Sequence, residues 1–181
     1  VAGPKELIEE YLEVVRSAGL KPVSIEIKAL SLYRLIRKTK FVDPKATCLV
    51  VDINEKVSDI SIFHDKALKI TRSVPILFEK TSTGQQSSVE KELPEETDSI
   101  YSLFRESDEE GEFTGSCSDL AHELERLMNF YRYTLNNRNQ EFARIVLSGD
   151  AARLHDIAAY LQERLNMEVA VAYSPNIMAD N

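Results

Sequence analysis

Apolar residues recur at helical spacing in four separate stretches of the chain, which predicts four helices. The first stretch follows Pro4, a residue suited to the first helical position, and precedes Gly19, which tolerates the left-handed conformation that ends many helices. The third has the longest apolar face, and Ser116 with Asp119 resembles a capping box at its start. The expected helices cover residues 4–18, 29–38, 116–136 and 151–165.

Six other stretches have the patterns of β-strands. Some alternate between apolar and polar positions, which indicates half-buried strands. Residues 47–53 are apolar up to Asp52, which indicates a strand buried on both faces. Short turns at 54–56 and 64–66 join three of the strands into an antiparallel meander. The expected strands cover residues 23–27, 47–53, 57–63, 67–76, 142–148 and 167–172, and their order among the helices predicts a layered α/β domain.

Residues 79–115 interrupt these patterns with an acidic, largely polar segment. They contain eleven acidic and three basic residues, a balance of -8 that equals the net charge of the whole chain. Such composition predicts disorder, apart from the apolar residues 100–104, which could dock as one or two helical turns. The segment is a candidate regulatory or docking element, and a solvated loop is the simpler interpretation. The rest of the chain has no basic stripe for nucleic acid or for an anionic membrane surface.

The remaining composition excludes several classes of protein. The 181 residues suffice for one large domain or two small ones, and no apolar run approaches the ~20 residues of a membrane span. The two cysteines, Cys48 and Cys117, predict no disulfide framework; Cys48 lies in an apolar strand and fits a buried thiol in a reducing cytoplasm. No Cys or His spacing is typical of a metal site. The N-terminus has no signal-peptide pattern, and residues 1–4 suggest a piece of a longer protein.

Two of the expected strands end in polar turns with candidate chemistry. Asp52 and Asn54 lie at the end of the strand expected at 47–53, and Ser148, Gly149 and Asp150 lie at the end of the strand expected at 142–148. Asp52 could cap the following hairpin or hold a ligand. Asp150 fits the N-cap of the helix expected at 151–165.

The chain resembles the PilM family of type IV pilus assembly proteins and, more distantly, FtsA, within the actin-like ATPase superfamily. The resemblance is carried by short stretches in a matching order: residues 18–22 with 25–27, 49–53, 72–76, 123–131 and 145–149. It implies an actin-like (ribonuclease H-like) fold, with a mixed sheet that contains a three-strand meander and is flanked by helices. It also implies a division of the chain: residues 1–45 as a helix-strand-helix remnant of the preceding subdomain, 46–78 with 116–175 as the second actin-like domain, 79–115 as an acidic, largely disordered insertion and 176–181 as a flexible tail.

The resemblance assigns nucleotide-binding roles to Asp52, Asn54 and Gly149, if nucleotide binding is retained. Asp52 would orient Mg²⁺ through water, the turn at Asn54 would meet the phosphates, and Gly149 would lie on the adenosine side. Several positions depart from the family pattern. Asn54 replaces the glycine that lets a backbone approach phosphate, no glycine follows the hairpin before Gly84, and Asp150 replaces a second glycine. These departures indicate a degenerate site.

The resemblance therefore implies a cytoplasmic scaffold rather than an enzyme, with no catalytic residue. It would be held at the inner face of the plasma membrane by the cytosolic tail of a PilN-like inner-membrane protein, without inserting into the membrane and without binding nucleic acid. No cofactor is expected on this interpretation, and self-association is left open. The alternative is a functional ATPase that binds ATP and Mg²⁺, and a generic α/β domain with an unrelated role is a third interpretation.

Overall fold

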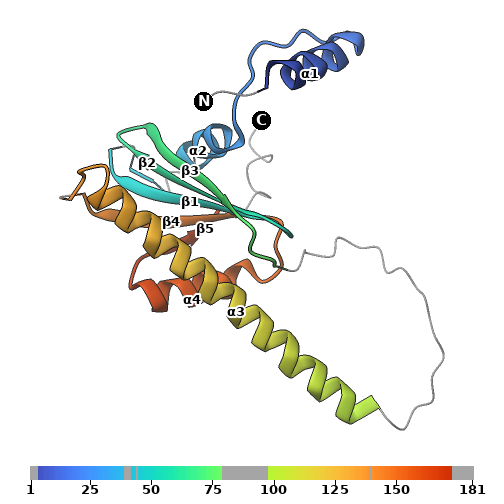
Figure 1. Cartoon of the computed structure of the whole chain (residues 1–181), viewed down its shortest axis with the longest axis vertical. Helices are drawn as coiled ribbons and strands as arrows, with labels where there is room; N and C mark the ends of the chain where they lie inside the picture. Colours follow the sequence, from blue (N-terminus) through green and yellow to red (C-terminus); the bar gives the residue numbers. More distant parts are fainter. Residues whose placement is uncertain (1–3, 39–41, 44, 79–97, 139, 173–181) are drawn as a thin grey trace.

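A five-stranded mixed sheet forms the centre of the computed structural model (Figure 1), which describes residues 4–38, 42–43, 45–78, 98–138 and 140–172. The strand order is β3-β2-β1-β4-β5. β1 pairs antiparallel with β2, and β2 with β3, whereas β1–β4 and β4–β5 are parallel pairs. The expected three-strand meander is therefore confirmed. The strands are β1 (Thr47–Ile53), β2 (Ser58–His64), β3 (Ala67–Val74), β4 (Phe142–Gly149) and β5 (Val169–Val171).

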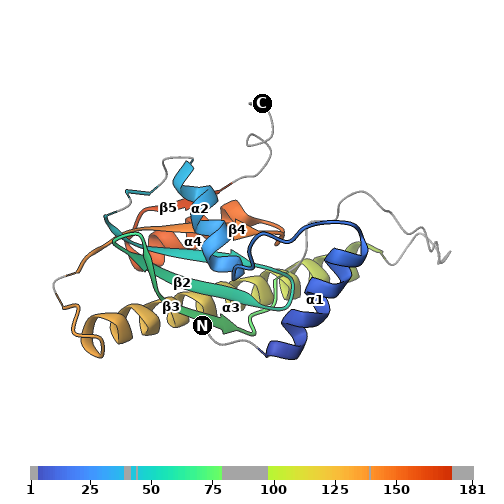
Figure 2. The same ribbon diagram turned by 90° about the horizontal axis from the view of Figure 1, so that it is seen from above.

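Helices flank both faces of this sheet. Figures 1 and 2 show α3 (Asp98–Tyr133) and α4 (Leu154–Leu165) on one face and α2 (Lys28–Lys38) on the other. α1 (Lys5–Ser17) lies apart from the sheet and buries none of its residues, although it has the apolar stripe that predicted it. Within the described ranges, no helix combines the length and the hydrophobicity needed to cross a membrane.

The central strand β1 contributes to two separate cores because its side chains alternate between the faces of the sheet. Leu49, Val51 and Ile53 face α3 and α4 within the larger apolar cluster. Cys48 and Val50 belong to the smaller cluster beneath α2. This alternation directs the next residue of the second series, Asp52, toward the α2 face of the sheet.

α3 begins much earlier than the sequence predicted. Its first residue is Asp98, so Ser116 and Asp119 lie inside the helix and do not form a capping box. Disorder was therefore the wrong prediction for residues 105–115, and the helical turns expected at 100–104 are part of this longer helix. Residues 79–97 lie outside the described part of the chain. Glutamate and arginine are good helix formers. A tertiary contact holds the end of the stretch nearest residue 115: the Phe113 ring packs edge-on against Phe78, with ring centroids 6.4 Å apart. The apolar residues 100–104 are helical in backbone, and their side chains are outside the described set.

The strand expected at residues 23–27 is not formed. Val23 is 94% exposed and Ile25 57% exposed, and the stretch pairs with no strand in the described part of the sheet. Alternating hydrophobicity predicts a strand only where a neighbouring strand is available to accept its backbone hydrogen bonds. The expected helix-strand-helix unit at the N-terminus is thus two helices joined by an irregular segment.

Candidate nucleotide site at the ends of β1 and β4

The two polar turns singled out in the sequence lie side by side in the structure. β1 and β4 are neighbouring parallel strands, so their carboxyl ends meet at one edge of the sheet. In the register of this pair, Asp52 lies beside Ser148 and Ile53 lies beside Gly149. Ligands of open α/β sheets bind beyond the carboxyl ends of the strands, so this edge is the candidate functional site.

Gly149 is required at this edge by a close backbone contact. Its φ is +126°, and a Cβ at this position would lie 1.9 Å from the carbonyl oxygen of Ile53. The same oxygen accepts hydrogen bonds from the backbone N–H groups of Asp150, at 3.1 Å, and Ala151, at 3.3 Å. The lack of a side chain at Gly149 therefore lets the end of β4 lie directly against the end of β1. The role of Gly149 on the adenosine side stays a prediction.

Asp150 does not cap a helix that begins at residue 151. α4 begins at Leu154, and its N-cap residue is Arg153, in the left-handed conformation with φ of 59°. The N–H groups of residues 150 and 151 are held by the carbonyl of Ile53, which keeps this segment alongside the end of β1 rather than in a first helical turn. The predicted cap was wrong for this reason.

Asp52 is a buried carboxylate, 6% exposed, with donors on both oxygens. The Ser148 hydroxyl donates to Oδ1 at 3.3 Å, and the Asn54 amide donates to Oδ2 at 3.2 Å. The Lys28 ammonium also forms an ion pair with Oδ2. These contacts come from the first residue of α2, the end of β4 and the turn after β1, so Asp52 links three parts of the fold.

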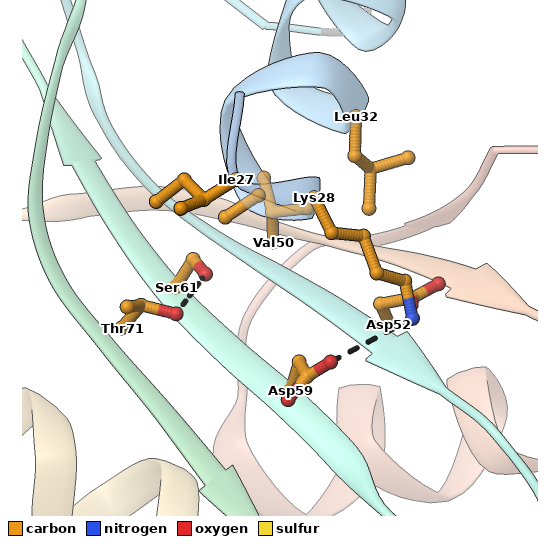
Figure 3. A pocket seen from close by; sticks show the side chains of 9 residues that line it. Ile27, Lys28, Leu32, Val50, Asp52, Asp59, Ser61 and Thr71 are labelled. Atoms are coloured by element: carbon orange, nitrogen blue, oxygen red, sulfur yellow. Dashed lines mark hydrogen bonds and ion pairs between the residues drawn. The ribbon is translucent and has the colours of Figure 1, made fainter. Parts of the chain in front are cut away.

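The Lys28 ammonium lies between two carboxylates, as Figure 3 shows. Asp59 on β2 is the direct cross-strand partner of Asp52, and one of its oxygens lies 3.6 Å from Lys28 Nζ. Burial alone would lower the pKa of the Lys28 ammonium. The hydrogen bond and charge of Asp52, together with the charge of Asp59, outweigh burial and raise that pKa.

Asn54 occupies the turn in a conformation that does not need glycine. It is absent from the described residues with positive φ. Its backbone N–H donates to the Val57 carbonyl at 3.2 Å, and its side-chain amide donates to the same carbonyl and to the carboxylate of Asp52. The hairpin is therefore closed by asparagine, whose amide turns back toward Asp52.

A small cavity lies between the start of α2 and the sheet (Figure 3). Its volume of about 180 Å³ is below the roughly 300–1,000 Å³ of typical small-molecule pockets. It is thus too small to enclose a nucleotide. It is lined by Ile27, Lys28, Ala29, Leu32, Val50, Asp52, Asp59, Ser61 and Thr71.

The fit of Mg²⁺ to Asp52 is poor because the carboxylate is already engaged. Mg²⁺ is usually held by one or two carboxylates and keeps several waters. Here the ammonium of Lys28 occupies the space between the two available carboxylates, Asp52 and Asp59. Among the described residues, no group of three or more His, Cys, Asp or Glu side chains is arranged to hold a metal ion.

Comparisons with known proteins identify the fold. No protein-family model and no curated protein matches the chain. Among solved structures, a PilM–PilN type IV pilus biogenesis complex is similar, with 19% identity, a TM-score of 0.57, and alignment over 93% of this chain and 48% of that chain. MreB5 of Spiroplasma citri bound to ADP is similar with 15% identity, a TM-score of 0.59, and alignment over 95% of this chain and 62% of that chain. The AMPPNP-bound form of MreB5 gives 13% identity and a TM-score of 0.58.

The chain therefore has the actin-like fold that its sequence predicted. It spans 48% of the chain from the PilM–PilN complex and 62% of the ADP-bound MreB5 chain, which is less than two thirds of either. The sequence singled out Asp52, Asn54 and Gly149, and the structure brings them to one edge of the sheet. Their nucleotide-binding roles stay predictions. The sequence did not identify Lys28 or Asp59 as part of this site. The available signal for Asp59 was its position in the hairpin. It is the second residue of β2 and pairs with Asp52, the second-to-last residue of β1.

Proposed function

We propose that the chain belongs to a cytoplasmic actin-like scaffold that serves a type IV pilus or a related competence or secretion machine. The scaffold binds the cytosolic tail of a PilN-like inner-membrane partner and is held at the inner face of the plasma membrane by that tail. Its nucleotide site is degenerate, and the protein is not an ATPase.

One observation supports the loss of nucleotide chemistry more than any other. The acidic residue in the position expected for a Mg²⁺-orienting group, Asp52, is neutralised by Lys28 and is further engaged by Asn54 and Ser148. A carboxylate with three donors has little remaining capacity to orient metal-bound water. The fold is kept while the chemistry expected at this strand end is blocked.

The similarity to a PilM–PilN complex supports the choice of partner. In that structure a protein with this fold is found together with PilN. The division of this chain into residues 1–45, 46–78 with 116–175, 79–115 and 176–181 remains part of the proposal, although α3 runs across the boundary between residues 115 and 116.

Peptide binding by the protein that contains this chain tests the scaffold role. A fluorescent peptide of the N-terminal cytosolic segment of the PilN-like protein from the same organism is titrated with the protein, and anisotropy is measured. We expect saturable binding that a scrambled peptide does not reproduce and that MgATP does not change. Absence of binding by the native peptide would contradict the scaffold role.

An ATP-binding function is the alternative, and the meeting of Asp52 and Gly149 at neighbouring strand ends favours it. The similar MreB5 structures contain ADP and AMPPNP. Calorimetric titration of MgATP into the protein that contains this chain distinguishes the ATP-binding function from the degenerate site. Saturable binding that Asp52→Ala abolishes supports the alternative, and no heat from either protein supports the degenerate site.

A further inference from the structure

We propose that the ammonium of Lys28 takes the place of a metal ion. It fills a cation site formed by the carboxylates of Asp52 and Asp59 and keeps divalent metal ions out of that site. This role deepens the proposed function and rests on it, because the proposed function takes this strand edge as the place where nucleotide chemistry has been lost. Lys28 lies at the start of α2, and neither the sequence pattern nor the fold identifies a role for it.

The sheet itself creates the need for a cation here. Asp52 and Asp59 are direct cross-strand partners of the antiparallel pair β1–β2. Like charges in such positions destabilise a sheet, because the side chains of directly opposite residues lie on the same face only a few ångströms apart. One of the two, Asp52, is also 6% exposed, so water screens it poorly. A positive charge between the two side chains removes this conflict.

Lys28 is positioned to supply that charge by the packing of α2. Lys28 is the first residue of the helix, and helical side chains lean toward the N-terminal end, which here lies over the strand edge. The helix is fixed on the sheet by Tyr33 and Ile36, both buried. The Tyr33 ring stacks on Phe63 with centroids 3.9 Å apart and planes 6° from parallel. The ammonium is thus carried by the first residue of an anchored helix, although the Lys28 side chain itself is 57% exposed.

The same arrangement excludes a divalent cation. Two carboxylates and one ammonium carry a net charge of -1, so a metal ion placed among them would lie close to the ammonium as well as to the carboxylates. The repulsion at such separations offsets much of the attraction. The ion would also have to compete with the Ser148 and Asn54 donors for the oxygens of Asp52. Only displacement of the Lys28 side chain would open the site.

Titration with Mn²⁺, followed by electron paramagnetic resonance of the free ion, tests the inference without nucleotide or partner. Wild-type protein is compared with Lys28→Met, which keeps the aliphatic length and removes the charge. We expect Lys28→Met to bind one Mn²⁺ at least about tenfold more tightly than wild type. The double variant Lys28→Met/Asp52→Asn should lose that gain, because it removes one of the two carboxylates.

Two further variants make the comparison specific. Lys28→Arg keeps a cation at the site and should resemble wild type. Lys5→Met removes another lysine from a helical ion pair, that of Lys5 with Glu9, and should not create a Mn²⁺ site. Equal Mn²⁺ affinity in wild type and Lys28→Met would overturn the inference.

A second measurement decides the matter if Lys28→Met does not fold. Mn²⁺ is added to the isotope-labelled wild-type protein, and paramagnetic broadening of backbone amide signals is recorded. Selective broadening at residues 52, 59 and 148 would show that the metal enters despite Lys28 and would refute the inference. Absence of that broadening would support it. Either result leaves the peptide-binding test of the scaffold untouched, so the two proposals fail separately.

Discussion

The backbone carbonyl of Ile53, the last residue of β1, occupies the space that a side chain at Gly149 would need. A Cβ at position 149 would lie 1.9 Å from that oxygen and 2.6 Å from its carbon. Both atoms belong to the backbone of a fully buried strand residue, which has no flexible side chain to move aside. The glycine is thus fixed by the sheet, whether or not any ligand is bound.

Gly149→Ala should therefore destabilise the protein severely. The substitution combines a steric conflict with β1 and a φ of +126°, which L residues rarely adopt. We expect a loss of at least about 2 kcal/mol in the free energy of unfolding, measured by urea denaturation. A nucleotide-only role for this glycine predicts instead a variant of nearly normal stability.

Gly115→Ala should have the opposite effect. Gly115 lies inside α3, and apart from the adjoining backbone of the helix itself, no described atom lies within 4 Å of the position that an alanine methyl group would occupy. Alanine in a helix interior is favoured over glycine by about 0.5–1 kcal/mol. The free energy of unfolding and the helical signal in far-ultraviolet circular dichroism should both increase. Gly111→Ala, in an equally open position, provides a replicate. Unchanged stability in both variants would show that residues 98–115 are not helical in solution.

Arg153 should hold the early part of α3 against the loop before α4. Its guanidinium pairs with Glu110 at 2.8 Å and with Asp156 at 2.7 Å, and it lies over the Phe113 ring at 3.8 Å from the centroid. Arg153→Gly removes these contacts and suits the left-handed φ at this position. Hydrogen exchange should become faster at the amides of residues 110–114. Arg164→Gln, which breaks the longer 4.0 Å pair with Glu125, should leave those amides protected.

Both cysteine thiols should be unreactive in the folded protein. Burial raises the pKa of Cys48 to about 12 and that of Cys117 to about 11, and the thiolate is the reactive form. At pH 8, an aromatic disulfide reagent should label neither residue in the native state and both in urea. Rapid labelling of one thiol without denaturant would contradict the burial of that residue.

The same thiols should make stability fall at alkaline pH. Their pKa values in the folded protein exceed the ordinary value of 9.0, so the folded state holds more protons than the unfolded state between pH 9 and about 11 or 12. Each thiol then lowers the free energy of unfolding by up to about 1.4 kcal/mol per pH unit within its window. Urea denaturation from pH 8 to pH 10.5 measures the decline, and Cys117→Ala should make it shallower. An equal decline in the variant would exclude Cys117 as a cause.

Local sequence patterns were sufficient to predict an element where the residues of that element are themselves buried. The apolar run at 47–53 predicted β1 because those seven residues are all buried, and the turn at Asp65 and Lys66 has the positive φ values of a tight hairpin. The fold class followed from the order of such elements. The alternation at Val23 and Ile25 misled because no strand of the described sheet lies beside it, which is a property of the rest of the chain.

The candidate site was predicted in part for a similar reason. Asp52 and Gly149 were found because each lies at the end of a buried strand, which is a local feature. Lys28 and Asp59 reach the site through the packing of α2 and the register of β2, and neither relationship is visible in a single stretch of sequence. Glu110 and Arg153 are a comparable case: their ion pair supports a helix that composition alone assigned to a disordered segment.

The parallel pairing of β1 with β4 also has a consequence for how the chain folds. Asp52 and Ser148 meet across 96 positions of sequence, so β1 has a partner on only one edge until residues 142–149 have left the ribosome. Pairings of such long range are slow to form. The nascent hairpin therefore exposes an apolar strand with an open edge during synthesis, and aggregation competes with folding at this stage.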